Sequence, residues 1–311
     1  MRKIWKILLS ILGVVLLIVV ALAAYVYFAP QPTYEDVPVA DLRVTVDSAS
    51  VARGQKLVMS NCQGCHASAD GTLSGLRFED EPANEAFGEY FASNITQHPT
   101  AGIGDYSDGE LYRFLRTGIK NDHTLGAVMM PRWILASDQD IHDMIAFLRS
   151  DHPAVAASDR TYPPHVSTFL ERALKKFAFK PYPLMDEYPE RPRLADSVAY
   201  GEYLVQAVNL CYACHSADLE ANDLAEPENS PGYLNGGYTF ALADHEITTP
   251  GLLLQEGNNI KDWTIDDFVH AVKFGQRPNN AAAFQKPMHP YPLLDTAEVR
   301  AIYLYLADFS K

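Results

Sequence analysis

The chain has 311 residues, of which 48% are hydrophobic and 21% are charged, and its formal net charge is −14 at pH 7. This length accommodates two small domains, and the composition excludes a disordered chain, a collagen-like chain and one built wholly of membrane spans. The acidic balance argues against nucleic acid as a partner, because an acidic surface repels phosphate.

An apolar segment lies near the start of the chain. Residues 7–28 carry no charge, and these 22 residues would extend ~33 Å as a helix, close to the ~30 Å hydrocarbon core of a bilayer. A signal-peptide core is only ~7 to 15 residues long, so we expect residues 1–29 to be a transmembrane anchor, with cleavage after the late alanines as the alternative. Arg2, Lys3 and Lys6 precede the segment, which leaves the N-terminus in the cytoplasm. We therefore expect a single-pass protein of a bacterial inner membrane, with the rest of the chain in the periplasm.

Proline-containing segments divide the rest of the chain. The prolines of residues 30–44 predict that this segment is a stiff polar stalk, which holds the following domains off the membrane. Residues 153–195 predict a proline-rich linker with an internal helix that can clamp two domains together. The lysines at the end of this helix can meet anionic lipid headgroups, although a solvated helix C-terminus is the simpler explanation. We place the two domains at residues 45–152 and 196–311.

All four cysteines lie in two copies of the pattern C-x-x-C-H. This pattern attaches c-type haem, because the two thiols form thioethers with the porphyrin and the adjacent histidine binds the iron. Zinc would require a second ligand pair at close range, and a redox dithiol needs no trailing histidine. The sequence therefore predicts two covalently attached c-type haems. Their attachment residues are Cys62, Cys65 and His66 in the first copy, and Cys211, Cys214 and His215 in the second.

The two motifs lie in duplicated segments. Residues 50–58, before the first motif, resemble residues 197–205, before the second, and we align Ile95-Thr96 with Ile247-Thr248 further on. The order of the similar segments is the same in both copies. The chain therefore contains two copies of one haem-binding module.

Helix signals agree with this duplication. Capping boxes begin at Ser107 and at Thr264, and each copy then ends in an amphipathic helix near residues 141–148 or 299–306. No run of alternating apolar and polar residues predicts a substantial sheet. We therefore expect a mostly α fold, with two haem-binding domains after one N-terminal transmembrane helix.

The register of the final helices pairs one methionine of the first module with one of the second. Ile141 precedes Val299 by 158 residues, and the same offset relates Met130 to Met288. A methionine upstream of the last helix in both copies is the expected sixth iron ligand, and a His/Met pair raises the reduction potential relative to bis-histidine ligation. Core packing is the alternative for a methionine, and His289 competes with Met288 for the second iron.

Five segments carry a further signal: residues 62–66, 94–96, 102–106, 111–118 and 130–131. They resemble the cytochrome c subunits of membrane-bound alcohol and gluconate dehydrogenases. The resemblance implies tandem class I-like cytochrome c domains that pass electrons from a dehydrogenase subunit towards ubiquinone or an oxidase. It also implies His66 with Met130, and His215 with Met288, as axial pairs. That family typically has three haem motifs and often a C-terminal membrane segment, whereas this chain has two motifs and an N-terminal apolar segment.

These observations favour an electron carrier over an enzyme. The expected function is a membrane-anchored dihaem cytochrome c in respiratory electron transfer, with a dehydrogenase, an oxidase or a soluble cytochrome as redox partner and the bilayer around residues 7–28. One alternative is a dihaem peroxidase, which needs an iron with an open sixth position. The other is an electron-transfer subunit of a membrane-bound dehydrogenase. A methionine at the same offset in both copies argues against an open iron site.

Overall fold

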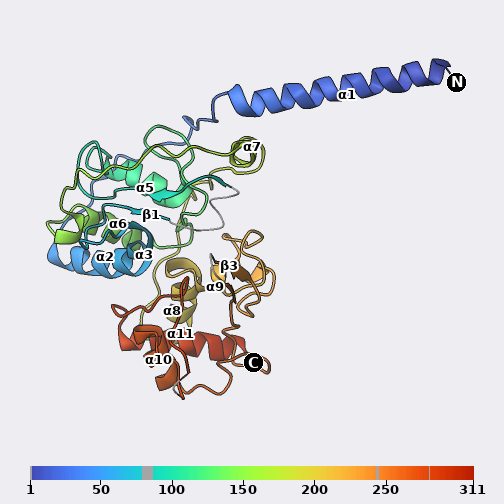
Figure 1. Ribbon diagram of the computed structural model, residues 1–311. Coiled ribbons are helices and arrows are strands. Elements are labelled where there is room, and N and C mark those ends of the chain that lie inside the picture. Colours follow the sequence, from blue (N-terminus) through green and yellow to red (C-terminus); the bar gives the residue numbers. More distant parts are fainter. Residues whose placement is uncertain (1, 79–86, 243–244, 280) are drawn as a thin grey trace.

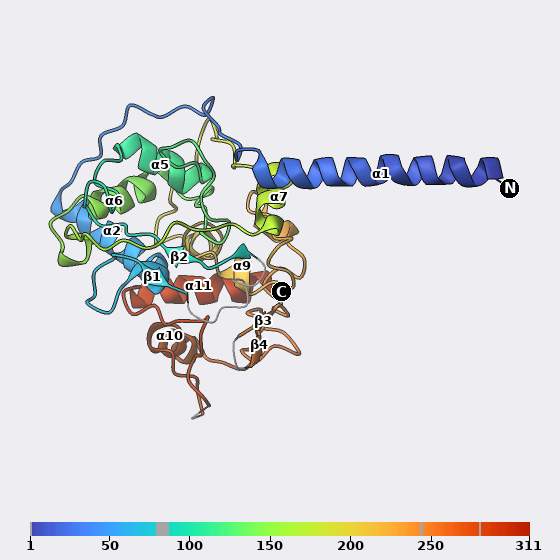
Figure 2. The same ribbon diagram turned by 45° about the horizontal axis from the view of Figure 1, so that its top comes forward.

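A long apolar helix projects from a mostly helical body in the computed structural model, which describes residues 2–78, 87–242, 245–279 and 281–311 (Figures 1 and 2). This helix, α1 (Arg2–Phe28), is the only one among the described residues that is long and apolar enough to cross a bilayer. Its most apolar stretch has none of its residues buried inside the protein. Such a helix needs an apolar environment that the rest of the described chain does not provide.

The body consists of two modules in which similar elements recur in the same order. Each begins with a helix that leads to a C-x-x-C-H motif, continues through a short antiparallel hairpin and a capped helix, and ends in a final helix. The first module contains α2 (Ser48–Asn61), α3 (Gln63–His66), β1 (Leu76–Arg77), β2 (Phe91–Ala92), α5 (Asp108–Thr117), α6 (Asp138–Leu148) and η1 (Pro153–Val155). The second contains α8 (Ser197–Tyr203), η2 (Leu204–Val208), α9 (Cys211–Cys214), η3 (Pro227–Asn229), β3 (Thr239–Ala241), β4 (Glu246–Thr248), α10 (Ile265–Phe274) and α11 (Thr296–Phe309).

A glycine permits the close crossing of the first and last helices in each module. A Cβ atom on Gly54 of α2 would overlap the carbonyl group of Asp143 in α6. In the same way, a Cβ atom on Gly201 of α8 would overlap the carbonyl group of Ala301 in α11. Asp143 and Ala301 are 158 residues apart, which is the offset that the sequence predicts for the final helices. The structure therefore confirms the duplication at these crossings.

The capped helices α5 and α10 also confirm the sequence analysis. Ser107 and Thr264 each form a reciprocal capping box with the acidic residue three positions further on. Gly118 and Gly275 end the two helices with φ values of 83° and 73°, the left-handed conformation that glycine adopts most easily. The two helices thus begin and end at equivalent positions.

The cores of the two modules are in contact. Cys62 and Ile141 belong to the core of the first module, and Tyr212 belongs to the core of the second. Leu57 and Leu135 of the first module pack against this second core. The modules lie one beside the other in both views of the ribbon, with α10 on the far side of the body from α5 (Figures 1 and 2). They therefore share an apolar interface.

The segment 30–44 differs from the expected projecting stalk, because it lies along the first module. The Tyr34 N–H donates to the His123 carbonyl oxygen at 2.9 Å. The Val44 N–H donates to the Asp108 carboxylate, also at 2.9 Å. The module thus supplies hydrogen-bond partners for the backbone of this segment, which an isolated extended strand would leave to water.

The helix expected within the linker is present as α7 (Phe169–Phe177). Among the described residues, its contacts are with the end of α1 and with the first module, including a hydrogen bond from the Tyr90 hydroxyl to Glu171. Its position in the linker suggested that it clamps the two modules together. The structure instead places it against the first module. The cause is the buried Glu171 carboxylate, whose partners are Tyr90 of the first module, His165 of the linker and Lys175 of α7 itself.

The crossings predict the effect of adding one methyl group. Gly54→Ala and Gly201→Ala are each expected to lower the free energy of unfolding by about 1–3 kcal/mol, because the new Cβ would force the helices apart. Chemical denaturation of the detergent-solubilised chain measures the change. Ala52→Ser, on the exposed side of α2, is the matched control and should leave the midpoint unchanged. Wild-type stability in both glycine variants would contradict the crossings.

Candidate functional site

The first C-x-x-C-H motif lies at the junction of α2 and α3. Cys62 ends α2 and is buried, whereas Cys65 is exposed. His66 ends α3 and is only 8% exposed, and its Nδ1 atom lies 2.7 Å from the Ser93 carbonyl oxygen. Because a carbonyl oxygen can only accept, Nδ1 carries the proton and Nε2 keeps a lone pair for a metal.

The second motif has the same arrangement. Cys211 and Cys214 begin and end the short helix α9, and His215 follows directly. His215 is 7% exposed, and its Nδ1 atom lies 2.8 Å from the Pro250 carbonyl oxygen. Its Nε2 atom is therefore also left to bind a metal.

Burial keeps both histidines neutral. It lowers the pKa of His66 and of His215 below the usual range, and the hydrogen bonds to the two carbonyl oxygens only partly oppose this effect. Neutral imidazole is the form that binds iron. Burial also raises the pKa of the Cys62 and Cys211 thiols to about 12. In each motif, two thiols at this spacing and a neutral histidine form the donor set that a c-type haem requires.

A glycine further along the chain bonds back to each histidine. The Gly75 N–H donates to the His66 carbonyl oxygen at 2.8 Å, and the Gly236 N–H donates to the His215 carbonyl oxygen at 2.7 Å. Both glycines have positive φ values, 98° and 65°. These glycines begin the return of the chain towards the carbonyl group that orients the histidine.

These hydrogen bonds correct one part of the sequence alignment. Since Ser93 and Pro250 accept from the two histidines, they are equivalent, and this places Ile95 opposite Leu252. The second Ile-Thr pair, residues 247–248, was aligned with Ile95-Thr96 but belongs to β4, which occupies the place of β2. That alignment was wrong because the register here depends on backbone contacts with the histidine and not on side-chain identity.

Met130 lies in the loop between α5 and α6. It is half-buried and packs against the core that contains Cys62, whereas its neighbour Met129 is 44% exposed. The buried Arg132 donates to the Met130 carbonyl oxygen and to the Ala127 carbonyl oxygen, which fastens the loop. The structure thus places Met130, and not Met129, on the inner side of this loop.

Met288 lies in the equivalent loop of the second module, between α10 and α11. It is half-buried, and Tyr291 beyond it packs against the second core. Burial raises the pKa of Tyr291, and the nearby Cys211 and Cys214 raise it further, so this end of the loop lies beside the second motif. His289, by contrast, is turned towards the first module, as described below.

A tryptophan connects the first methionine loop to the second motif. Trp133, three residues after Met130, is 2% exposed and donates its Nε1–H to the Val208 carbonyl oxygen at 3.0 Å. Val208 ends η2, three residues before Cys211. The sequence analysis did not predict this contact, because no local pattern links residues that are 75 positions apart.

A histidine makes the reciprocal connection. The Nε2 atom of His289 lies 3.1 Å from the Ser60 carbonyl oxygen, two residues before Cys62. His289 directly follows Met288. The methionine loop of each module therefore contacts the segment that leads into the cysteine motif of the other.

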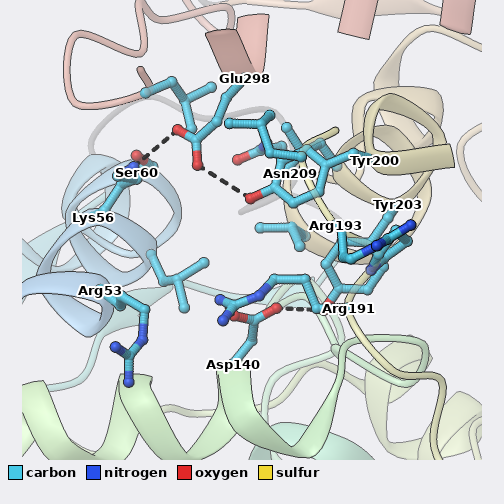
Figure 3. A pocket seen from close by; sticks show the side chains of 16 residues that line it. Arg53, Lys56, Ser60, Asp140, Arg191, Arg193, Tyr200, Tyr203, Asn209 and Glu298 are labelled. Carbon is cyan, nitrogen blue, oxygen red and sulfur yellow. Dashed lines mark hydrogen bonds and ion pairs between the residues drawn. The ribbon is translucent and has the colours of Figure 1, made fainter. Parts of the chain in front are cut away.

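A cavity of about 460 Å³ lies between the modules (Figure 3). Lys56 of α2 forms an ion pair with Glu298 of α11 at 2.9 Å on one wall, and Arg191 of the linker pairs with Asp140 of α6 at 2.7 Å on another. The Tyr203 hydroxyl also contacts Asp140 across the interface. Both acids are largely buried, so these pairs hold the modules in a defined relative position.

Comparison with known proteins identifies the class of the first module. Residues 51–151 match the family model of cytochrome c. This segment runs from α2 to just beyond α6 and includes the first motif and Met130. The chain is therefore mostly helical and contains a cytochrome c domain.

Individual relatives are similar to this chain over 76% of its length, which is more than the first module alone. The chain is 29% identical over 246 residues to the cytochrome c subunit of alcohol dehydrogenase (quinone) from Gluconobacter oxydans, covering 76% of this chain and 49% of that protein. It is 28% identical over 248 residues to the gluconate 2-dehydrogenase cytochrome c subunit of Pantoea cypripedii, covering 76% of this chain and 53% of that protein. A diheme cytochrome c-type protein of Cereibacter sphaeroides is 28% identical over 253 residues, covering 76% of this chain and 77% of that protein.

The chain thus spans about half the length of the two dehydrogenase subunits it matches. The relatives confirm the similarity to cytochrome c subunits of dehydrogenases that the sequence motifs indicated. All three names describe a cytochrome c, a class of haem protein that transfers electrons.

The contact between the modules predicts the effect of removing one hydrogen bond. Trp133→Phe keeps an aromatic ring but leaves the Val208 carbonyl oxygen without this donor, so we expect the free energy of unfolding to fall by about 1–3 kcal/mol. The control is Trp263→Phe, since Trp263 packs against the second core but its indole N–H bonds to no described residue. The shift in denaturation midpoint distinguishes the two. Equal shifts would contradict a specific role for the Trp133 bond.

Proposed function

We propose that this chain is a membrane-anchored dihaem cytochrome c that transfers electrons between redox partners and catalyses no reaction of its own. The observation that supports it best is the pair of buried histidines, each with Nδ1 bonded to a carbonyl oxygen and Nε2 left for iron. A bound haem would supply an iron that accepts and releases one electron. Cys62 and Cys65 would attach the first haem, and the two cysteines of α9 the second.

Met130 and Met288 are the proposed sixth ligands. Met130 packs against the core that contains Cys62, and the Met288 loop lies beside the second motif. His289, which competes with Met288 as a ligand of the second iron, instead bonds to the Ser60 carbonyl oxygen at the interface between the modules. His/Met ligation closes both irons to external ligands and raises their reduction potentials relative to bis-histidine ligation.

The reciprocal contacts support a relay between the two haems. Electron transfer falls off steeply with distance, so a two-haem carrier needs its haem-binding segments close together. Trp133 and His289 connect each methionine loop to the other motif, and the ion pair between Lys56 and Glu298 reinforces the interface. These residues would fix the separation of the haems, which is what a relay requires of the protein.

The proposed location is a bacterial inner membrane. Residues 7–28 of α1 would lie in the bilayer, with the cations before them on the cytoplasmic side and both modules in the periplasm. Apart from the three N-terminal cations, the chain has 22 basic and 39 acidic residues, a net charge of −17. This charge favours encounter with a basic face on a redox partner.

The proposed electron donor is the catalytic subunit of a dehydrogenase, and the acceptor is an oxidase or a soluble cytochrome. The relatives support this choice, because those from Gluconobacter oxydans and Pantoea cypripedii are named as cytochrome subunits of dehydrogenases. The same names do not favour the peroxidase alternative. A peroxidase would also require one of the two methionines to leave its iron open.

Substitution of the methionines tests the proposed ligation. The oxidised wild-type protein is expected to show the charge-transfer band of methionine-bound ferric haem, and the reduced protein should not bind carbon monoxide. Met130→Ala and Met288→Ala should each lose part of this band and open one haem to carbon monoxide, with a lower reduction potential at that haem. Optical spectra and redox titration measure these changes.

Two neighbouring substitutions are the matched controls. Met129→Ala and His289→Ala should keep the band and stay inert to carbon monoxide. Binding of carbon monoxide by the reduced wild-type protein would contradict the relay and favour the peroxidase. An open haem in His289→Ala together with an unchanged Met288→Ala would assign His289 as the ligand instead.

A further inference from the structure

We propose that α7 is an amphipathic helix that lies in the membrane surface, beside the point where α1 leaves the bilayer, and binds anionic lipid headgroups. This inference rests on the proposed function only in taking α1 as the membrane anchor. It assigns a lipid-binding surface to a helix outside the transmembrane segment. Three independent observations carry it: an exposed apolar face, a fixed orientation and a local positive charge.

The exposed face of α7 is apolar. Val166, just before the helix, is 76% exposed, and Phe169, Leu170 and Phe177 are 52%, 47% and 59% exposed. Helical spacing places Phe169, Leu170, Ala173 and Phe177 on one side of the helix. Large apolar side chains clustered in this way are the mark of a surface that meets a membrane or another protein.

The opposite face is held against the first module. Glu171 is fully buried and accepts hydrogen bonds from the Tyr90 hydroxyl at 2.8 Å and from His165 Nε2 at 2.6 Å. Lys175 forms an ion pair with it at 2.8 Å. Burial alone would raise the pKa of Glu171, but Lys175, Ser167 and His165 outweigh burial and lower this pKa to about 2. Glu171 is therefore ionised at neutral pH, and its contribution to docking is lost only as the pH falls from about 4.5 towards 2.

The docked helix lies directly beside the end of α1. Lys176 Nζ donates to the Ala29 carbonyl oxygen at 3.0 Å, and Arg172 donates to the Tyr27 carbonyl oxygen at 3.2 Å. Both views show α7 next to the C-terminal end of α1 and running across its axis (Figures 1 and 2). A helix that crosses the end of a transmembrane helix lies in the plane of the membrane surface.

The local charge favours an anionic bilayer over another occupant. Residues 166–180 contain four cations and one acid, a net charge of +3, in contrast to the acidic chain as a whole. Lys180 at the end of this segment is exposed. Basic residues beside a bilayer are attracted to the negative potential of anionic lipids. The same surface would repel a second copy of this segment.

Photo-cross-linking of the full-length protein in lipid nanodiscs tests this proposal. The variant Phe169→p-benzoylphenylalanine places the photoreactive group on the exposed face of α7. The same replacement at Leu17 of α1 reports the anchor, and the replacement at Phe274, which is 54% exposed in the second module, is the control. Mass spectrometry measures the yield of lipid adduct at each position.

We expect lipid adducts at residues 17 and 169, with at least about tenfold less at residue 274. The yield at residue 169 should rise about fivefold when phosphatidylglycerol replaces phosphatidylcholine, as expected from ~1 kcal/mol for one exposed cation, Lys180, near an anionic surface. Adducts at residue 17 without adducts at residue 169 would overturn this inference and leave the anchor intact. A lack of adducts at residue 17 would overturn the anchor itself. Equal yields in both lipids would contradict recognition of anionic headgroups, and protein cross-links at residue 169 would identify a protein interface instead.

Discussion

The hydrogen bond from a buried histidine to a backbone carbonyl oxygen is the interaction on which each module depends. It fixes the tautomer of His66 and of His215 and the direction in which Nε2 points. The acceptors, Ser93 and Pro250, lie 27 and 35 residues further along the chain. In each module, a glycine that bonds back to the histidine carbonyl oxygen and a short hairpin precede this acceptor. The hairpins therefore serve the orientation of the histidine, and they account for most of the small strand content of a mostly helical chain.

The interface between the modules connects the two C-x-x-C-H motifs to each other. Each methionine loop contacts the segment that leads into the other motif, through Trp133 on one side and His289 on the other. Ion pairs around the cavity between the modules add polar contacts that define the relative position of α2 and α11. At the other end of the first module, α7 and the segment 30–44 bind the module to the end of α1. The arrangement is consistent with the proposed relay, and it places the first module beside the end of α1.

Local patterns predicted a large part of this account, and long-range contacts explain the remainder. The apolar run, the capping boxes and the amphipathic final helices are each patterns within one continuous segment, so the sequence shows them directly, and comparing the two final helices gives the offset of 158 residues. The packing of α7 depends on a bond between Glu171 and Tyr90, which are 81 residues apart, and no periodicity announces it. The same holds for the contact of Val44 with Asp108, which replaces the expected stalk, and for the contact of His289 with Ser60. The misplaced alignment of residues 247–248 has a related cause, since backbone groups define that register.

The number of covalent haems per chain is the most direct test of the central claim. Intact-mass spectrometry and the alkaline pyridine spectrum should show two haems in the wild-type protein. They should show one haem in the variant Cys62→Ala/Cys65→Ala, and one in Cys211→Ala/Cys214→Ala. A single haem in the wild-type protein, with no loss in one of the two variants, would contradict the claim that both motifs bind haem.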